Sequence, residues 1–189
     1  MRAEDRREQI LDVVREIVAA EGFHAASPKR VADDAGITRP VLYQQFGDMA
    51  GLFVALIDRE AGRAAAQFLE VVVAFDDAAP ADAFWRIFDA VIAGVDAAPA
   101  TWRLFLLPPE GAPPALHQRL ADSDEQVRAY LREMLRAHFP HVEDPDYTAL
   151  VMHAAGRELL RQRVLDPEDA TRQRLTALVT RLVAAMGPR

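Results

Sequence analysis

The chain has 189 residues, 51% hydrophobic and 27% charged, with a formal net charge of −7, which suits one sizeable core or two small ones and excludes a disordered chain. The absence of cysteine excludes disulfide frameworks, cysteine zinc sites and thiolate nucleophiles. No apolar run reaches the roughly 18 residues of a membrane span, so we expect a cytoplasmic protein, and the acidic balance restricts nucleic-acid binding to a local basic face.

Apolar residues recur at helical spacing along almost the whole chain, and no stretch alternates with period two for long enough to predict a strand. We therefore predict an all-α fold, in which the first helix runs from about Glu4 to Glu21. Gly22 follows it, where a C-terminal cap is common. One side of this helix carries an apolar stripe, made of Ile10, Val14, Ile17 and Val18.

Two short helices are predicted next, near residues 28–35 and 39–45, and their arrangement indicates a helix-turn-helix. Gly36 lies where the chain has to turn sharply, and Ile37 can fill the angle between the two helices. Taken by itself, such a corner is equally compatible with an ordinary helical hairpin that carries solvated charges.

Polar residues surround this corner in a pattern that favours DNA binding. Ser27 and Thr38 precede the two short helices and are predicted to cap them. Lys29 and Arg30, on the helix near residues 28–35, are expected to lie near the phosphate backbone of DNA. The exposed face of the helix near residues 39–45 comprises Arg39, Pro40, Tyr43 and either Gln44 or Gln45. An arginine, a phenol and carboxamides on one short helix suit the major groove, where they can reach base edges and phosphates.

A long fourth helix is predicted to start at a capping Asp48, to continue past Gly62 and to end near residue 75. Beyond it, proline-containing breaks divide the rest of the chain into about five helices. These breaks lie at Pro80, Pro99, Pro108–Pro114, Pro140–Pro145 and Pro167.

The last two predicted helices carry apolar stripes that fit a helix–helix interface. The candidates are Leu150 and Ala154 on the first of them and Leu175, Leu178, Val179 and Leu182 on the second. On the residues alone, packing within one chain and pairing of two chains explain these stripes equally well.

Aromatic and soft side chains of the middle and later helices are candidates for a small-molecule pocket. They are Phe68, Phe88, Trp102, Phe105, Met134 and His153. A helical core would contain the same residue types, so the pattern predicts a pocket only in combination with other observations.

Several separated motifs arrive in a fixed order between about residues 6 and 57. They are Ala20-Glu21-Gly22-Phe23, Val31-Ala32, Ala35-Gly36-Ile37-Thr38, Leu42-Tyr43-Gln44-Gln45-Phe46 and Leu52-Phe53. At this spacing the segment resembles the tetracycline-repressor (TetR) family. The resemblance implies a helix-turn-helix DNA-binding domain of three helices over 1–50 and a larger helical domain for ligand binding and dimerisation over 51–189.

The DNA-contacting positions of the family map onto this chain residue by residue. The resemblance implies phosphate contacts by Lys29 and Tyr43, base contacts by Arg39 and Pro40, and either kind by Gln45. It gives Thr38 a double role, as cap and as backbone contact. One position departs from the family: Met49 stands near the start of the fourth helix, where a lysine is usual, so we expect weaker or more salt-sensitive binding.

In this family the middle helices surround a ligand cavity, and the last two helices pair with those of a second subunit. The resemblance therefore implies a homodimer that binds operator DNA and is released from it by a small-molecule effector, with repression as the default.

Other chemistries find little support in the sequence. His138, His141 and Glu143 resemble metal ligands, but Pro140 breaks their helical spacing, and a solvated loop explains them better. No glycine-rich phosphate loop and no nucleophile motif is present, so we expect no enzyme, no cofactor and no metal. A helical interaction protein of the same fold, with weak or lost DNA binding, is the alternative, since the net charge is negative and Met49 replaces a lysine.

Overall fold

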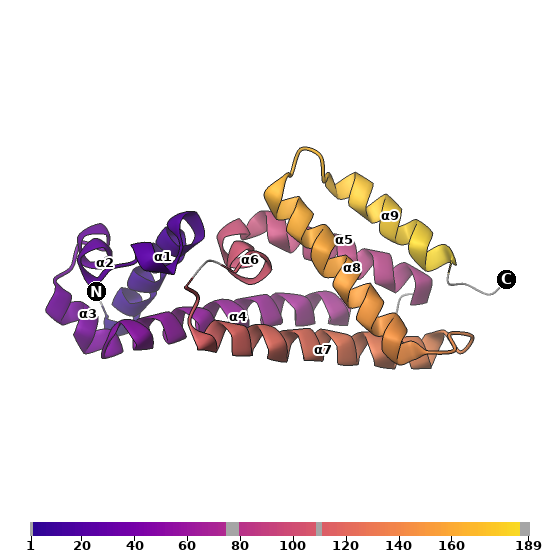
Figure 1. Cartoon of the computed structure of the whole chain (residues 1–189), viewed down its shortest axis with the longest axis horizontal. Coiled ribbons are helices and arrows are strands. Elements are labelled where there is room, and N and C mark those ends of the chain that lie inside the picture. Colours follow the sequence, from indigo (N-terminus) through magenta and orange to yellow (C-terminus); the bar gives the residue numbers. More distant parts are fainter. Residues whose placement is uncertain (1, 75–79, 109–110, 186–189) are drawn as a thin grey trace. The chain divides into compact units, whose positions relative to one another are not determined.

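The computed structural model describes residues 2–74, 80–108 and 111–185, and the regular elements in these ranges are all helices (Figure 1). The all-α prediction is therefore confirmed. The elements are α1 (Ala3–Glu21), the 3₁₀ turn η1 (Phe23–Ala25), α2 (Pro28–Asp34), α3 (Arg39–Phe46), α4 (Met49–Ala74), α5 (Pro80–Ala97), α6 (Pro99–Leu106), α7 (Pro114–His138), α8 (Pro145–Leu165) and α9 (Arg172–Ala185). No helix of the described ranges is both long and apolar enough to span a bilayer.

The predicted helix boundaries are confirmed to within a few residues, and prolines account for many of them. A proline is the first residue of α2, α5, α6, α7 and α8. The first N–H groups of a helix have no partner within the helix, so a residue without an N–H costs nothing there. Asp48 starts α4 as predicted, because its carboxylate accepts a 2.7 Å hydrogen bond from the Gly51 N–H.

The chain divides into two compact units. The first comprises Met1–Ala64 with Ala100–Leu120, and the second comprises Ala65–Pro99 with Ala121–Arg189. The core of the first unit gathers apolar side chains of α1, α2, α3, α4, α6 and α7, including Ile10, Val14, Val31, Leu42, Leu52, Leu56, Ile57, Leu104 and Leu116. The helix-turn-helix is thereby fixed to a core that the short helices could not form by themselves.

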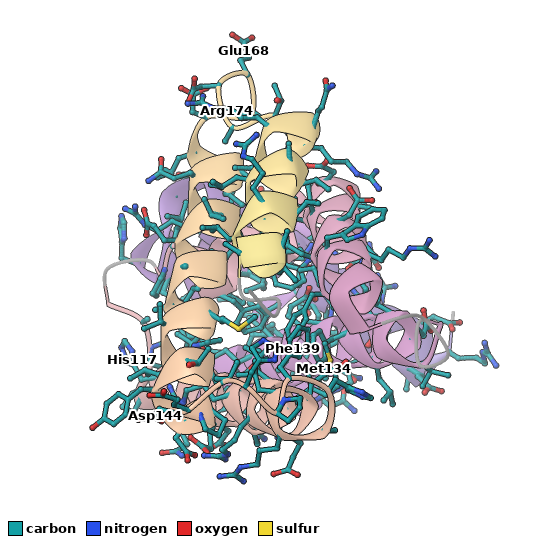
Figure 2. All side chains as sticks on the ribbon, turned by 90° about the vertical axis from the view of Figure 1, so that its right-hand side faces the viewer. His117, Met134, Phe139, Asp144, Glu168 and Arg174 are labelled. Carbon is teal, nitrogen blue, oxygen red and sulfur yellow. The ribbon has the colours of Figure 1, made fainter. Side chains whose placement is uncertain are left out.

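The second unit has a core of its own, which contains Phe84 of α5, Leu135 of α7, Phe139 directly after α7, Ala149 of α8 and Val183 of α9. Figure 2 shows Met134 and Phe139 among the packed side chains of this unit, whereas Glu168 lies in the turn between α8 and α9 and Arg174 in the first turn of α9. Helix α9 packs along α5, and Arg172 donates two hydrogen bonds of 2.7 and 2.5 Å to Asp89. These bonds lower the pKa of Asp89.

Candidate nucleic-acid interface

The corner between α2 and α3 has the geometry that its residues predict. The Ser27 hydroxyl accepts a 3.3 Å hydrogen bond from the Arg30 N–H, which confirms Ser27 as the cap of α2. Gly36 has a φ of +62°, in the left-handed region that glycine adopts without strain. The Ile37 N–H then donates to the Ala32 carbonyl at 2.9 Å, and its half-buried side chain packs against the core of the first unit.

The predicted side-chain cap at Thr38 is wrong. Thr38 precedes α3 in an extended conformation, but its hydroxyl accepts no capping hydrogen bond. A capping oxygen binds the second or third N–H of a helix. Here the second position is Pro40, which has no N–H, and the N–H of Val41 donates to the Thr38 carbonyl at 3.0 Å instead. The hydroxyl has no free N–H to bind.

The outer face of α3 is polar and accessible. Arg39, Pro40, Tyr43 and Gln44 are exposed, and Gln45 is half-buried. The opposite side of the helix anchors it, since Leu42 is buried and Phe46 packs against the core. Within the described ranges no carboxylate pairs with Arg39, so its guanidinium is available to an external acceptor.

The two cations of α2 have acidic neighbours one helical turn away. Lys29 Nζ lies 2.7 Å from Asp33, and Arg30 lies 2.5 Å from Asp34. The positive charges of Lys29 and Arg30 are therefore balanced locally. Exposed pairs of this kind contribute little to stability, so a phosphate can replace the carboxylate at little cost.

Helix α1 contributes two polar contacts to the corner that sequence reasoning missed. Arg7 donates a 2.8 Å hydrogen bond to the Gln45 carbonyl, and its guanidinium lies over the Phe46 ring. Gln9 donates a 3.3 Å hydrogen bond to the Ala35 carbonyl. These contacts reach the C-terminal ends of α3 and α2.

The start of α4 approaches the end of α3 closely. A Cβ atom on Gly51 would lie 2.2 Å from the Phe46 carbonyl oxygen, so only glycine fits there. Met49 is half-buried and packs against the core of the first unit. It offers no cation where the TetR resemblance leads one to expect a lysine, and weaker DNA binding on that account stays a prediction.

The predicted pocket residues are distributed over both units, with Trp102 and Phe105 in the first and Phe68, Phe88, Met134 and His153 in the second. Phe68 packs edge-on against Tyr130, with ring centroids 5.7 Å apart. Two grooves lie within the units: one of about 190 Å³ between α7 and α8, and one of about 350 Å³ at the end of α1 beside α6. None of the six predicted residues lines either groove, and their role stays a prediction.

His153 is the titratable residue among the predicted pocket residues. Its side chain is 12% exposed, and its Nε2 lies 3.3 Å from Asp124 Oδ1. Burial lowers the pKa of His153 below its usual 6.5; the Asp124 charge raises it, and Arg128 and Arg157 lower it further. No three described His, Asp or Glu side chains are grouped as metal ligands.

We expect the lowered pKa of His153 to make the protein less stable as the pH falls below about 6.5, because the unfolded chain then binds a proton that the folded chain resists. Urea unfolding at about pH 7.5 and about pH 5.5 measures the effect. His153→Gln should reduce the difference between the two free energies of unfolding, whereas His117→Gln, at an exposed position, should leave it unchanged. An undiminished difference in His153→Gln would contradict the assignment.

Comparisons with known proteins agree with this geometry. Residues 10–56 match the family model described as bacterial regulatory proteins, tetR family, and residues 79–186, more than half of the chain, match the tetracyclin repressor-like C-terminal domain. The transcriptional activator FasR of Mycolicibacterium smegmatis is 39% identical over 56 residues, which are 30% of this chain and 26% of FasR. The regulator UidR of Escherichia coli K12 is 36% identical over 70 residues, which are 37% of this chain and 36% of UidR.

The chain spans only about a quarter to a third of the length of the two curated relatives above. Solved structures share the fold over nearly the whole chain. A TetR-like regulator from Rhodococcus sp. RHA1 has a TM-score of 0.74 at 24% identity and covers 95% of this chain and 96% of its own. FadR of Bacillus subtilis, solved with stearoyl-CoA, has a TM-score of 0.75 at 14% identity, covering 96% and 99%. With family models matching both parts of it, the chain belongs to the tetR family of bacterial regulatory proteins.

Proposed function

We propose that the protein is a DNA-binding transcription regulator, a repressor that a small molecule releases from its operator in the cytoplasm. The observation that carries the proposal is the outer face of α3, where Arg39, which has no carboxylate partner among the described residues, lies beside Tyr43 and Gln44 on a helix anchored through Leu42. Base contacts specify a sequence and phosphate contacts position the protein. We assign Arg39 and Pro40 to bases, and Lys29 and Tyr43 to phosphates.

The first test compares two single substitutions on this face. Arg39→Ala should weaken binding to the preferred duplex by about 1–3 kcal/mol, about 5- to 150-fold, and relax the preference for it, because a bidentate base contact is lost. Lys29→Ala should weaken binding to preferred and random duplexes alike and reduce the salt dependence by about one phosphate contact. Fluorescence anisotropy with both duplexes over a salt series measures each effect.

The matched control is Arg119→Ala, which removes an arginine from an exposed ion pair with Asp58 in the same unit. It should bind both duplexes like the unmodified protein. If Arg39→Ala and Lys29→Ala also bind both duplexes unchanged, α3 is not the recognition helix.

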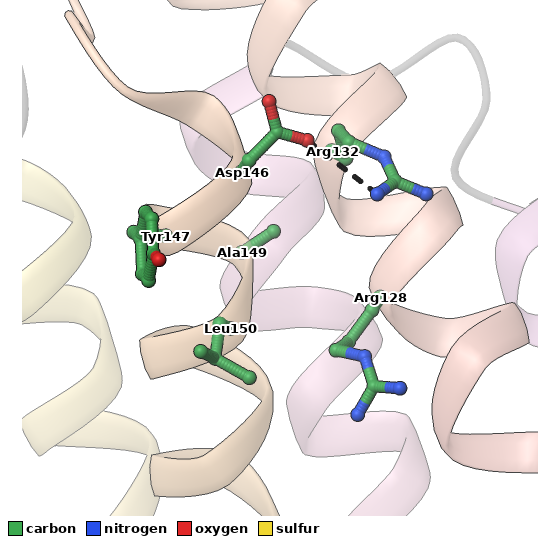
Figure 3. A pocket seen from close by; sticks show the side chains of 6 residues that line it. All are labelled: Arg128, Arg132, Asp146, Tyr147, Ala149 and Leu150. Carbon is green, nitrogen blue, oxygen red and sulfur yellow. Dashed lines mark hydrogen bonds and ion pairs between the residues drawn. The ribbon is translucent and has the colours of Figure 1, made fainter. Parts of the chain in front are cut away.

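We propose a homodimer, because one short recognition helix covers too few bases for useful specificity and a two-fold axis repeats it. Support comes from α8, where Tyr147, Leu150, Val151 and Ala154 form an exposed and largely apolar strip. Figure 3 shows Tyr147 and Leu150 of α8 lining one groove together with Arg128 and Arg132 of α7. An exposed apolar strip on the surface of a folded chain is typical of a site that binds another protein chain.

The predicted residues of α9 differ in how much surface they offer to a second subunit. Leu182 is exposed, Leu178 and Val179 are half-buried, and Leu175 is buried in the chain's own core. We therefore centre the proposed interface on α8, with Leu182 of α9 at its side.

The effector is proposed to be a small, largely apolar molecule. Support comes from the half-buried Phe68, Phe88 and Met134 of the second unit and from the similar FadR fold, which was solved with stearoyl-CoA. Helix α4 is continuous from Met49 to Ala74, so a shift caused by the effector could reach the start of α4 next to α3.

A helical interaction protein without DNA binding is the second candidate, favoured by Met49 and by the locally neutralised Lys29 and Arg30. The two functions differ in salt dependence, because DNA binding releases counterions and weakens steeply with salt. A chain that binds no duplex at any salt concentration would support the interaction protein.

A further inference from the structure

The recognition helix α3 is held at its C-terminal end by an arginine of α1. Arg7 Nη1 donates a 2.8 Å hydrogen bond to the Gln45 carbonyl, and its guanidinium carbon lies 4.4 Å from the centroid of the Phe46 ring. Carbonyls of a last helical turn have no partner within the helix, so a cation there satisfies one of them and complements the helix dipole. The stacking on Phe46 adds a cation–π contact to the same turn.

Arg7 matters because α3 has few other anchors. The helix has eight residues, of which only Leu42 is buried. Isolated helices need about 12–15 residues to be stable in water, so the direction of α3 depends on contacts with other helices. Gly47, which ends α3, has a φ of +77° and no Cβ to hold the chain in place.

The same turn of α1 also contacts the end of α2. Gln9 Nε2 donates a 3.3 Å hydrogen bond to the Ala35 carbonyl, and Arg6 orients the Gln9 amide by donating to its Oε1 at 3.0 Å. Helix α1 therefore contacts the C-terminal ends of both helices of the helix-turn-helix. On the recognition helix this contact is made by Arg7.

We propose that Arg7 is a positioning residue for sequence-specific DNA binding, which sets the direction of α3 without touching DNA. The inference rests on the proposed function, because the direction of α3 matters only if α3 reads bases. Without the guanidinium the end of α3 can move, and the base contacts of Arg39 are lost while phosphate contacts persist. An arginine that itself bound phosphate would strengthen binding to every sequence alike.

The test measures the affinity of Arg7→Ala and Arg7→Lys over a salt series. The probes are a duplex that the unmodified protein enriches from a random pool and a random-sequence duplex of equal length. We expect both variants to lose about 10-fold affinity for the enriched duplex, to bind the random duplex within about two-fold of the unmodified protein, and to keep its salt dependence. Arg7→Lys is decisive because it keeps the positive charge but loses the planar guanidinium, which donates to the Gln45 carbonyl and stacks on the Phe46 ring at the same time.

Arg119→Ala serves as the control, since it removes the same charge from an exposed pair in the same unit. Equal losses on both duplexes, with a salt slope reduced by about one phosphate contact, would show that Arg7 touches DNA and would overturn the proposal. Unchanged binding by both Arg7 variants would overturn it as well.

Hydrogen–deuterium exchange supplies a readout that does not depend on DNA. Faster exchange confined to residues 39–47 in both Arg7 variants is expected, whereas unchanged exchange there, or equally fast exchange in every core helix, contradicts local positioning. If the unmodified protein enriches no duplex, the proposed function fails by itself, whatever the exchange experiment gives.

Discussion

Replacing Glu60 with alanine is expected to lower the free energy of unfolding by about 3–5 kcal/mol, because it leaves a buried arginine without its nearest carboxylate. Glu60 is 0% exposed and the adjacent Arg59 side chain 10% exposed. Arg59 Nε donates to Glu60 Oε1 at 2.9 Å. Arg59 Nη2 lies 2.7 Å from the same oxygen without hydrogen-bond geometry, so that attraction is Coulombic.

Glu60 joins three helices of the first unit. Thr101 of α6 donates a short hydrogen bond to its second carboxylate oxygen. Arg59 in turn reaches Glu8 and Asp12 of α1, each at 3.1 Å. Removing Glu60 takes the one fully buried carboxylate from this network, which leaves Arg59 with the half-exposed carboxylates of Glu8 and Asp12 and the buried Thr101 hydroxyl without its acceptor.

Asp58→Ala provides the control on the same helix. Asp58 pairs with Arg119 at 2.7 Å, and both side chains are about half exposed, so its loss should cost no more than about 1 kcal/mol. Urea unfolding of Glu60→Ala, Asp58→Ala and the unmodified chain measures the contrast. Similar losses in the two variants would show that the Glu60 network contributes no more than a surface pair.

Val151→Asp is expected to convert the proposed dimer to a monomer and to reduce affinity for the preferred duplex by about 1,000-fold, toward the level of non-specific binding. Val151 is 64% exposed on α8, beside Leu150 and Ala154. A carboxylate there would have to be buried without a partner in the interface. Sedimentation at micromolar concentration and anisotropy with the enriched duplex measure the two effects.

The matched control for this prediction is Leu69→Asp on α4, where an apolar side chain of similar exposure, 62%, lies outside the proposed interface. It should sediment as a dimer and bind DNA normally. A Val151→Asp variant that remains dimeric would exclude α8 as the contact surface, and an unmodified chain that sediments as a monomer would exclude the dimer.

The helices and the corner could be predicted because their causes are local. Ser27, Gly36 and the initial prolines act on neighbouring backbone groups, and helical periodicity places the apolar stripes. The same local reasoning explains the error at Thr38, since the missing N–H of Pro40 is visible in the sequence. The pairing of Lys29 with Asp33 could also have been predicted from its spacing of four residues.

Contacts between distant segments could not be predicted in this way. Arg7 precedes Ile10 and Leu11 by one helical turn, which indicates an inward direction, but nothing in the sequence assigns it to the end of α3. Likewise, the aromatic character of Phe88 and Trp102 does not determine whether either side chain contacts a ligand. Such assignments depend on how helices pack, and this is set by the whole core.

Selection of duplexes from a random-sequence pool by the purified chain tests the central claim most directly. The account predicts enrichment of an approximately two-fold symmetric site, with half-sites about one helical turn or a multiple of it apart, and binding that weakens steeply with salt. It further predicts that Arg39→Ala, carried through the same selection, loses the enriched base pattern. A chain that enriches no sequence over repeated rounds, or whose enriched sequence is unaffected by Arg39→Ala, would contradict recognition of DNA through α3.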